Sequence, residues 1–551
     1  MFLSLTQLYF SIFTGGCGAC IVILSKYDPV LDQVEEYSIN SCLTLLCSLN
    51  GCSITTSDGL GNTEKGFHPI HKRFAGFHAS QCGFCTPGMC ISLYSALSKA
   101  HNSQSSPDYL TALAAEKSIA GNLCRCTGYR PIADACKSFA SDVDIEDLGF
   151  NSFWRKGESR EEMLKKLPPY NPEKDLITFP DFLKEKIKCQ HNVLDQTRYH
   201  WSTPGSVAEL QEILATTNPG KDRGLIKLVV GNTGTGYYKE EKQYGRYIDI
   251  SHIPEMSMIK KDDREIEIGA VVTISKVIDA LMEENTSAYV FKKIGVHMEK
   301  VANHFIRNSG SIGGNLVMAQ SKSFPSDITT LLLAADASVH MINAGRHEKL
   351  RMGEYLVSPP ILDTKTVLLK VHIPRWIASS TTGLLFETYR AALRPIGSAL
   401  PYINAAFLAV VSHDASSSGI IVDKCRLAFG SYGGYHSIRA REVEDFLTGK
   451  ILSHSVLYEA VRLLKGIIVP SIDTSYSEYK KSLAVGFLFD FLYPLIESGS
   501  WDSEGKHIDG HIDPTICLPL LSSAQQVFES KEYHPVGEAI IKFGAEMQAS
   551  G

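Results

Sequence analysis

The stretches SQCGFCTPGM at residues 80–89 and GNLCRCTGYRPI at residues 121–132 place two close pairs of cysteines on either side of a helical span. Four thiolates are the protein ligands that one iron–sulfur cluster needs. A helix is expected to begin within SQCGFCTPG, where its N-terminus would stabilise a negative cluster. Structural zinc is the alternative interpretation, but Cys-x-Cys as the second pair is unusual for zinc, so the spacing favours iron. The predicted ligands are Cys82, Cys85, Cys124 and Cys126.

A second set of cysteines, Cys17, Cys20 and Cys42, lies nearer the start of the sequence. Its spacing resembles the plant-type arrangement Cys-x4-Cys-x2-Cys with a fourth cysteine later in the chain. The first position of that arrangement falls on Ile12, and an isoleucine cannot coordinate iron. A cluster at this set would therefore lack one of its four expected thiolates.

The remaining cysteines show no pairing that indicates a metal. Cys47 and Cys52 are spare candidates for the first set, but we interpret them as small buried apolar side chains. Ten of the 14 cysteines lie within residues 17–126, and long chains in reducing compartments use such clustering for metals. We therefore expect a cytoplasmic protein. Structural roles are expected for Cys90, Cys136, Cys189, Cys425 and Cys517.

The overall composition is typical of a soluble globular protein, with 44% hydrophobic and 21% charged residues. The formal net charge of -6 shows no basic excess, which argues against a nucleic-acid partner. The apolar segment MFLSLTQLYFSIF at residues 1–13 is too short to span a bilayer and lacks the positive region of a secretory signal. We expect neither membrane association nor export.

Shifts in composition divide the 551 residues into six segments, because one hydrophobic core cannot serve so long a chain. A small β-rich unit precedes a helical unit, in which we expect two helical hairpins. A charged, proline-bearing stretch then indicates an extended linker. Apolar runs alternating with helical stretches predict an α+β or α/β domain, strands followed by helices predict a sheet covered on one face, and the last segment shows no convincing element. The segments are residues 1–60, 61–140, 141–194, 195–382, 383–495 and 496–551.

Two glycine-rich segments, LVVGNTGTG at 228–236 and SGSIGGN at 309–315, point to a dinucleotide site. Small residues let backbone N–H groups face a pyrophosphate without interference from a Cβ atom. The first segment lacks the spacing of the Rossmann fingerprint and would alone be read as a turn. Two such loops, however, could hold a dinucleotide from both sides. Asp327 follows as a candidate for contact with a ribose.

These motifs together resemble the molybdenum hydroxylases, the xanthine dehydrogenase and aldehyde oxidase family. The resemblance covers nearly the whole chain and is closer to the plant aldehyde oxidases, through SIGGNLVMAQ, FPSDI, YRAALRPIGSALPYINAAF and AVGFLFDFLYPL. The segments that carry the family resemblance occur in the family's order: GGCGAC, LSKYDP, SCLTLLCS, TTSDGLGN, SQCGFCTPGM and GNLCRCTGYRPI.

The resemblance implies a multi-domain α+β fold. It would comprise a partial β-grasp ferredoxin-like domain, a four-helix iron–sulfur domain, and an FAD domain of the vanillyl-alcohol-oxidase type with an α+β C-terminal subdomain. It also implies a relay in which a molybdenum cofactor oxidises the substrate and electrons pass through two [2Fe–2S] clusters to FAD and then to O2. The cluster of Cys82 would lie nearer molybdenum with Gln81 beside the molybdenum cofactor, and Cys17, Cys20 and Cys42 would hold the other cluster.

The same resemblance implies an FAD site and its electron acceptor. Xanthine dehydrogenases tend to carry an acidic residue where Gly234 stands and an acidic cluster where this chain reads RPIGSALP, so NAD is disfavoured as the acceptor. The implied FAD-binding residues are Val229, Val230, Gly231, Asn232, Thr233, Gly234, Thr235, Ser311, Gly314, Asn315, Asp327, Leu368 and Arg390.

The chain departs from the family pattern at both ends. The expected N-terminal segment with the first cysteine ligand is missing, and the sequence stops at GAEMQASG, where the molybdenum domains would begin. We therefore expect that this chain alone neither binds the molybdenum cofactor nor oxidises an aldehyde. One hypothesis is a redox module that works with a molybdenum subunit in trans or a full-length aldehyde oxidase. The alternative is a non-catalytic truncated paralogue or interaction protein.

Overall fold

The computed structural model describes residues 15–551 with gaps. Ile12 and Cys517 lie outside the described residues, and so does the side chain of Cys189. The gaps are residues 30–31, 103–109, 146–147, 155–157, 190–194, 197–198, 217–224, 239–243, 284–288, 344, 360–365, 380, 394–398, 414–418, 470–475 and 499–530.

The first unit is a three-stranded antiparallel sheet. Strand β1 (Ile21–Asp28) lies between β2 (Gln33–Asn40) and β3 (Ser53–Thr55), as the apolar run IVILS and the strand-like SITT predict. Two short 3-10 helices, η1 (Ser41–Leu43) and η2 (Leu46–Leu49), connect β2 to β3. The loop before β1 and helix η1 carry the first cysteine set, so this sheet positions Cys17, Cys20 and Cys42.

A helical unit packs on this sheet through α4, and its helices bury an apolar core that includes Phe74, Met89 and Ile132. Helix α4 begins at Thr86, directly after the CGFC segment, which confirms the predicted helix start. The helices of this unit are α2 (Ser57–Leu60), α3 (Pro69–Gly76), α4 (Thr86–Asn102), α5 (Ala112–Ser118) and α6 (Arg130–Lys137).

The segment expected to be an extended linker instead contains three short helices, α7 (Arg160–Lys166), α8 (Pro172–Asp175) and α9 (Asp181–Cys189). It crosses the surface of the helical unit and is held there by apolar and polar contacts. Met163, Leu167 and Phe179 are buried. The charged residues around them concealed these apolar anchors, although Met163 and Leu167 are four residues apart, as on one face of a helix.

The central unit contains two sheets. The four-stranded sheet has the order β4-β5-β7-β6, and the five-stranded antiparallel sheet has the order β11-β10-β12-β9-β8. Their strands are β4 (Asp195–Gln196), β5 (Tyr199–Ser202), β6 (Leu225–Val229), β7 (Tyr244–Asp249), β8 (Ile259–Lys261), β9 (Glu265–Gly269), β10 (Ser338–Asn343), β11 (Arg346–Arg351) and β12 (Thr366–Pro374).

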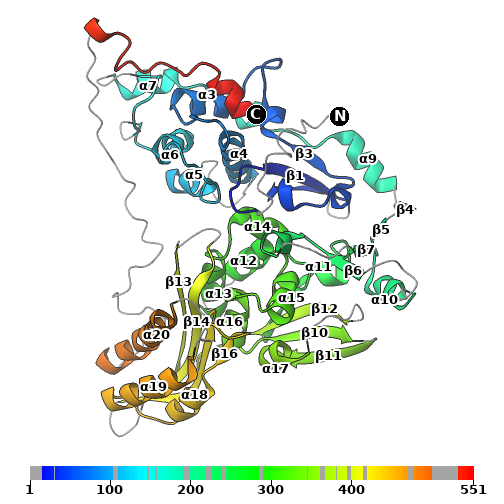
Figure 1. Cartoon of the computed structure of the whole chain (residues 1–551), viewed down its shortest axis with the longest axis vertical. Helices are drawn as coiled ribbons and strands as arrows, with labels where there is room; N and C mark the ends of the chain where they lie inside the picture. Colours follow the sequence, from blue (N-terminus) through cyan, green and yellow to red (C-terminus); the bar gives the residue numbers. More distant parts are fainter. Residues whose placement is uncertain are drawn as a thin grey trace.

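Eight helices and one 3-10 helix of the described residues belong to the central unit, and most of them share its core with the five-stranded sheet. They are α10 (Val207–Thr216), η4 (Thr233–Gly236), α11 (Pro254–Ser257), α12 (Ile274–Met282), α13 (Tyr289–Met298), α14 (His304–Ser309), α15 (Ile312–Lys322), α16 (Asp327–Ala334) and α17 (Met352–Val357). In Figure 1, α14 lies at the top of this unit, directly below the three-stranded sheet. Its contacts with β2 join the two units.

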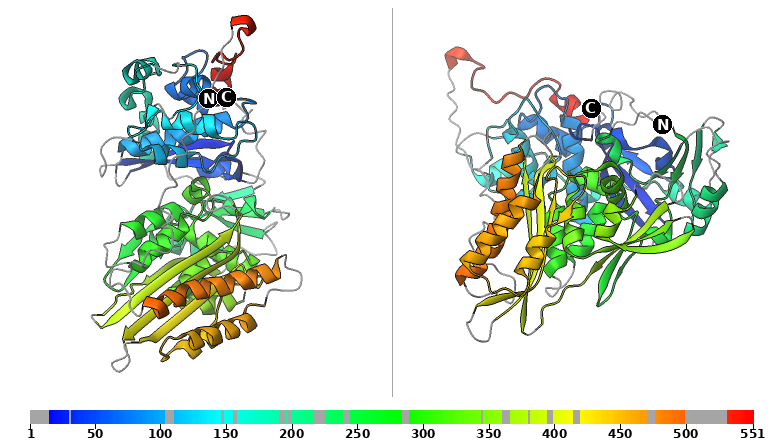
Figure 2. Two further views of the ribbon diagram at one scale, coloured as in Figure 1. Left: turned by 90° about the vertical axis from the view of Figure 1, so that its left-hand side faces the viewer. Right: turned by 60° about the horizontal axis from the view of Figure 1, so that its bottom comes forward.

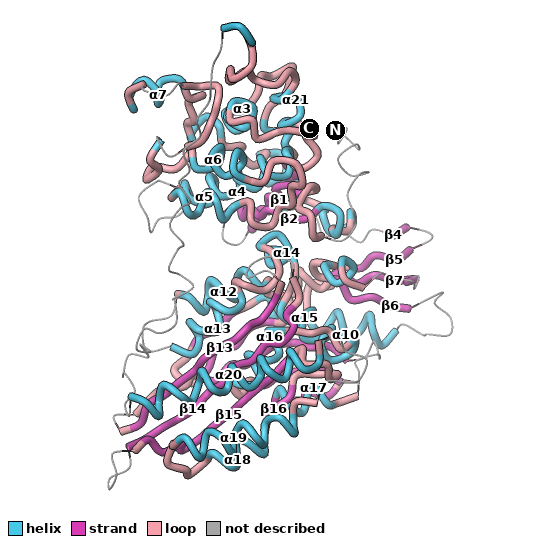
Figure 3. Tube along the Cα trace, turned by 60° about the vertical axis from the view of Figure 1, so that its left-hand side comes forward, coloured by secondary structure: helices cyan, strands magenta, loops and turns pink. Residues whose placement is uncertain are grey.

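A second antiparallel sheet of order β13-β14-β15-β16 follows in sequence. Figure 3 shows α20 and α19 running across one face of its long strands. The other face contacts α16 of the central unit, so the sheet is covered on both faces and the prediction of one covered face was incomplete. The elements are β13 (Thr382–Ala392), β14 (Pro401–His413), β15 (Ile420–Gly430), β16 (Ile438–Arg439), α18 (Arg441–Leu447), α19 (His454–Ile467) and α20 (Ser477–Ser498).

The last described segment, residues 531–551, returns to the helical unit. It contains η6 (Lys531–Tyr533) and α21 (Ala545–Ser550), and α21 packs against α3 and α4. Both Figure 1 and the left view of Figure 2 place this segment, in red, beside the blue helices of the N-terminal half. The prediction of no element here was wrong, because the tail takes its structure from a distant surface. No helix within the described ranges has the length and apolar character needed to cross a bilayer.

Candidate redox and dinucleotide site

The two predicted pairs of cysteines lie close together, just before the starts of α4 and α6. Cys82 and Cys85 precede α4, and Cys124 and Cys126 precede α6. The thiol of Cys85 is a neighbour of that of Cys124, and the thiol of Cys126 is a neighbour of that of Cys82, closely enough for each pair to affect the other's pKa. The structure therefore brings all four predicted ligands together.

The surroundings of these thiols shift their pKa values in different directions. Burial, followed by the neighbouring Cys124, raises the pKa of the Cys85 thiol to about 12. Burial opposes ionisation of Cys124 as well, but hydrogen bonds from Thr127 leave its pKa below the usual value. The Thr127 hydroxyl lies 3.2 Å from the Cys124 sulfur. Such contacts stabilise thiolate, the form that binds metal.

The first set gathers in the same way at the end of β2. The side-chain hydrogen bond with Cys42 is the main cause that lowers the pKa of Cys20 to about 6. The Asn40 amide lies 3.7 Å from the Cys20 sulfur and donates to it. Cys17 lies near enough to raise the pKa of Cys42 further. Three thiols thus share this site, with N–H donors of the kind that tune a cluster's potential.

The pairing of the thiols suits a two-iron cluster. Among the described residues, no three histidine, cysteine, aspartate or glutamate side chains form a group that could hold one metal ion. In a two-iron cluster, each iron takes two protein sulfurs and two bridging sulfides, so contacting pairs of thiols are the arrangement required. The Cys82–Cys126 and Cys85–Cys124 pairs meet that requirement.

The two cysteine sets are in direct contact through the backbone. The N–H of Leu123, next to Cys124, donates to the carbonyl of Cys17 at 2.8 Å. The Asn122 side chain donates to the carbonyl of Gly18 at 2.9 Å. Gly18 has a φ of +69°, and a Cβ atom there would lie 2.8 Å from the carbonyl oxygen of Gly121. Only glycine permits this approach of the two loops.

The remaining candidates occupy varied positions. Cys90, Cys136 and Cys425 are buried, as structural roles require, whereas Cys47 is exposed and Cys52 is half-buried, so the expectation of burial was wrong for these two. Gln81 is exposed beside Cys82, and its carbonyl accepts a hydrogen bond from Lys542 of the tail.

The two glycine-rich segments line one cavity of about 760 Å³ in the central unit. The first segment ends β6 and forms η4, and the second caps and opens α15, so both predicted loops are placed at one site. The volume suits a large cofactor. All thirteen residues implied for FAD line this cavity: Val229, Val230, Gly231, Asn232, Thr233, Gly234, Thr235, Ser311, Gly314, Asn315, Asp327, Leu368 and Arg390.

Close packing between the two loops requires glycine at position 231. A Cβ atom there would lie 1.8 Å from the carbonyl oxygen of Ser309, which no side chain allows. On the second loop, the Ser311 hydroxyl accepts the N–H of Gly314 at 3.0 Å and caps α15. The N-terminus of α15 therefore opens into the cavity, where its dipole and free N–H groups favour an anionic group such as a pyrophosphate.

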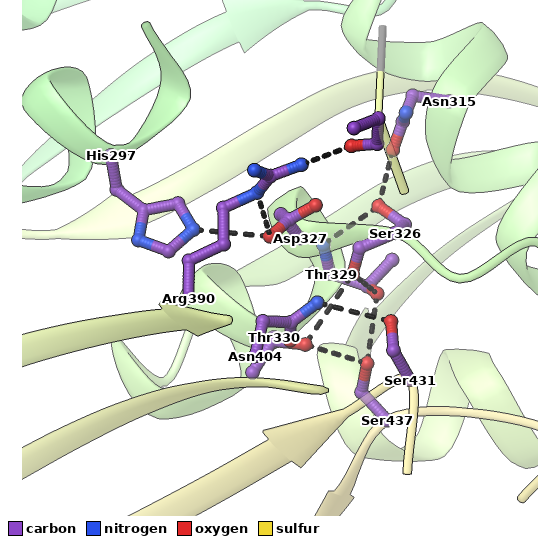
Figure 4. A network of polar contacts seen from close by, with 11 residues as sticks. His297, Asn315, Ser326, Asp327, Thr329, Thr330, Arg390, Asn404, Ser431 and Ser437 are labelled. Carbon is purple, nitrogen blue, oxygen red and sulfur yellow. Dashed lines mark hydrogen bonds and ion pairs between the residues drawn. The ribbon is translucent and has the colours of Figure 1, made fainter. Parts of the chain in front are cut away.

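A buried polar network forms one wall of the cavity. Figure 4 shows His297 and Arg390 both pointing toward Asp327. His297 Nε2 and Arg390 Nε each lie 3.2 Å from Asp327 Oδ1. Both contacts are made to Oδ1, and Asp327 lines the cavity. The other carboxylate oxygen, Oδ2, takes no part in these two contacts.

The network continues away from Asp327 through short side chains. The Ser326 hydroxyl donates to Asn315 Oδ1 at 2.5 Å, and the hydroxyls of Thr330 and Ser437 lie 2.8 Å apart. These contacts tie α15, α16 and the C-terminal sheet to one another (Figure 4). The wall of the cavity is therefore fixed before any ligand binds.

The cavity also touches the first cysteine set. Gly15 and Gly16, which precede Cys17, line the cavity. The amide of Asn232 donates from Nδ2 to the carbonyl of Leu43, which follows Cys42, at 2.9 Å. The three sites consequently form a row: the Cys82 set, the first set and the cavity.

Three family models match the chain. The model of the FAD binding domain in molybdopterin dehydrogenase matches residues 196–376, that of the [2Fe-2S] binding domain matches 56–137, and that of the CO dehydrogenase flavoprotein C-terminal domain matches 387–495. The chain belongs to the molybdenum hydroxylase family. It contains the iron–sulfur and FAD-binding domains of this family and is aldehyde oxidase-like.

Relatives from plants cover nearly all of the chain. Abscisic-aldehyde oxidase of Arabidopsis thaliana is 69% identical over 98% of this chain and 40% of its own length. An indole-3-acetaldehyde oxidase of Arabidopsis thaliana is 53% identical over the same shares. Probable aldehyde oxidase 4 of Oryza sativa subsp. japonica is 48% identical, and the match covers 98% of this chain and 66% of that relative. The chain spans 40% of the length of the first two relatives.

Sequence reasoning missed several residues of this molybdenum hydroxylase site. His297 gave no signal because it acts through a long-range contact to Asp327, and Lys227 was not singled out although it lies only five residues before Asn232. Gly15 and Gly16 belong to the GGCGAC motif and line the cavity, but the motif gave no prediction of a flavin contact. A glycine pair beside a metal-binding cysteine is a signal of close approach by another group, and it could have been used.

Proposed function

We propose that this chain is the electron-transfer part of an aldehyde oxidase-like enzyme, in which two [2Fe–2S] clusters pass electrons from a molybdenum centre to FAD and then to O2. The row of three sites, joined by the Leu123–Cys17 and Asn232–Leu43 hydrogen bonds, carries this proposal. With a molybdenum domain, the overall reaction would convert an aldehyde, water and O2 to a carboxylic acid and H2O2. The partner would be a molybdenum-domain subunit or a full-length aldehyde oxidase.

The cysteines would hold the clusters, which supply one-electron chemistry when bound. We assign Cys82, Cys85, Cys124 and Cys126 to the cluster nearer molybdenum and Cys17, Cys20 and Cys42 to the other. Gln81 is assigned to a position beside the molybdenum cofactor, and its exposure beside Cys82 is consistent with contact to another domain. Amide and hydroxyl donors around the sulfurs would hold the thiolates and set the potential.

The cavity would hold FAD in an extended form. Backbone N–H groups of residues 231–235 and of the α15 N-terminus would bind the pyrophosphate. Asp327 would accept a ribose hydroxyl through Oδ2, while Arg390 and His297 hold its other oxygen. Leu368 would pack against an apolar part of the cofactor. The absence of an acidic residue at Gly234 supports O2 over NAD as acceptor.

The finer architecture belongs to the same proposal. The three-stranded sheet is consistent with a partial β-grasp ferredoxin-like domain, α3–α6 with a four-helix iron–sulfur domain, and the central unit with a vanillyl-alcohol-oxidase-type FAD domain. We keep 1–60, 61–140, 195–382 and 383–495 as domain boundaries. We further propose that the protein acts in the cytoplasm.

The test is reconstitution of the purified chain with iron, sulfide and FAD, followed by metal, sulfide and flavin analysis. We expect bound iron and flavin, and bleaching of the visible absorbance on anaerobic addition of dithionite. Cys85→Ser should lose cluster absorbance, whereas Cys425→Ser, which alters an equally buried thiol far from the site, should keep it. Zinc without iron, or a colourless protein, would contradict the proposal and favour the non-catalytic alternative.

A further inference from the structure

The side-chain amide of Asn232 is fixed at both ends. Its Nδ2 atom donates to the carbonyl of Leu43 at 2.9 Å, and its Oδ1 atom accepts from Lys227 Nζ at 2.7 Å. The residue also stands at φ +53° in front of η4, so the backbone holds the amide in one direction. An amide held at both ends is an oriented link, because neither rotation nor a flip preserves both bonds.

This amide spans the junction between the first cysteine set and the cavity. Leu43 follows Cys42 directly in η1. On the other side, Gly231 and Thr233 line the cavity on either side of Asn232. The route from the Cys42 sulfur to the cavity therefore runs along one peptide, one hydrogen bond and one short side chain.

We propose that Asn232 is a positioning residue for electron transfer, which holds the Cys42 loop against the flavin loop and completes the hydrogen-bonded route between them. The inference rests on the proposed function and deepens it. Each reduced [2Fe–2S] cluster releases one electron and returns to its oxidised form. Two electrons and two protons from water convert FAD to FADH2. Electron tunnelling weakens steeply with distance and more so across gaps, so a bonded route of fixed length favours fast transfer.

Other contacts hold the two units together, so loss of this one bond should act locally. Lys276 Nζ lies 2.8 Å from a carboxylate oxygen of Glu35, and Asn308 Nδ2 donates to the carbonyl of Ser38 at 2.9 Å. Asn308 offers a matched control. It uses the same donor atom, the same type of acceptor and the same distance across the same interface, but it does not line the cavity.

The experiment compares the unaltered chain, Asn232→Gly and Asn308→Ala, each reconstituted with iron, sulfide and saturating FAD. Glycine is chosen because it accepts the positive φ of position 232 and only removes the amide. Each protein is reduced with dithionite and mixed with O2, which takes two electrons and two protons from FADH2 to form H2O2. Reoxidation of the clusters is then followed by absorbance and by electron paramagnetic resonance, per bound flavin.

We expect cluster reoxidation to be several-fold slower in Asn232→Gly than in the unaltered chain, and unchanged in Asn308→Ala. In flavin-free protein, hydrogen exchange at residues 41–45 should also be faster in Asn232→Gly than in the unaltered chain, and it should be unchanged in Asn308→Ala. If Asn232→Gly does not retain FAD, Asn232→Asp, which keeps the shape and lacks the donor, takes its place.

The outcomes separate the two proposals. If flavin does not speed cluster reoxidation in the unaltered chain, the proposed function fails. If flavin does speed it and Asn232→Gly matches the unaltered chain, the function stands and the role of Asn232 is overturned. The role of Asn232 is also overturned if a chain that holds only the cluster of Cys82 still reduces its flavin, because no electron then leaves the Cys42 loop.

Discussion

Asp327 shows how one residue combines structural and binding roles. Asp327 is 3% exposed, its carboxylate is held through Oδ1 by Arg390 and His297, and the residue lines the cavity. A buried carboxylate without partners would be very unfavourable, so the arginine is needed for folding as well as for orientation. The histidine adds direction, because its ring is buried and its position is fixed by α13.

Asp327→Ala should therefore lower the free energy of unfolding by about 3–5 kcal/mol, since it removes the carboxylate that pairs with the buried Arg390 guanidinium. His297→Ala should lower the free energy of unfolding by less, but it should also weaken FAD binding. Urea unfolding and fluorescence titration with FAD measure the two effects. In a double-mutant cycle with Asp327→Asn, the effect of His297→Ala on FAD affinity should vanish. Full additivity would show that His297 does not act through Asp327.

His71 provides a test of pH dependence at the residue scale. Burial lowers its pKa to about 3 from the ordinary value of 6.5, so the folded chain keeps it neutral while the unfolded chain takes up a proton. Stability is therefore complete above pH 6.5 and is lost as the pH falls toward 3, by about 1.4 kcal/mol per pH unit. When the pH falls from 6.5 to 5, the free energy of unfolding of the unaltered chain should decrease by about 2 kcal/mol more than that of His71→Gln. Equal losses in urea unfolding would contradict this prediction.

At the scale of elements, α15 links stability to cofactor binding. Its cap residue Ser311 satisfies the N–H of Gly314 and fixes the helix end that opens into the cavity. Ser311→Ala should lower the free energy of unfolding by about 1 kcal/mol and should weaken FAD binding. Ser453→Ala is the matched control, because Ser453 caps α19 through Val456 in the same way, away from the cavity. A similar loss of stability without any change in FAD affinity is expected there.

Elements also show what the sequence could and could not predict. The spacing of Cys82, Cys85, Cys124 and Cys126 was sufficient for the prediction of one site, because tight pairs leave few ways to arrange four sulfurs. The glycine loops were predicted for a similar local reason. In contrast, the Leu43–Asn232 contact joins residues 189 positions apart, and no pattern in either segment specifies its partner. The C-terminal helix was missed because it depends on a distant surface, whereas α7 was missed although its capping box, Ser159 with Glu162, is a local signal.

At the scale of the whole molecule, three hydrophobic cores imply units that can unfold separately. One core fills the helical and three-stranded unit, one the central unit, and one the C-terminal sheet and its helices. The cavity walls come mainly from the central unit. In cluster-free protein, FAD at about 100 times its Kd should stabilise that unit by about 2.7 kcal/mol. Calorimetry should show that FAD raises the unfolding temperature of the central unit and leaves that of the helical unit unchanged. Equal shifts would indicate one cooperative body.

The contact between the tail and the helical unit has a consequence for biosynthesis. The Ser57 hydroxyl donates to the carbonyl of Ala549, across a separation of 492 residues. A ribosome makes the N-terminal half first, so the surface of α3 and α4 that receives α21 stays uncovered until residues 545–550 have been synthesised. Cluster insertion can therefore precede the docking of α21, and newly made chains would carry an open Cys82 loop during that interval.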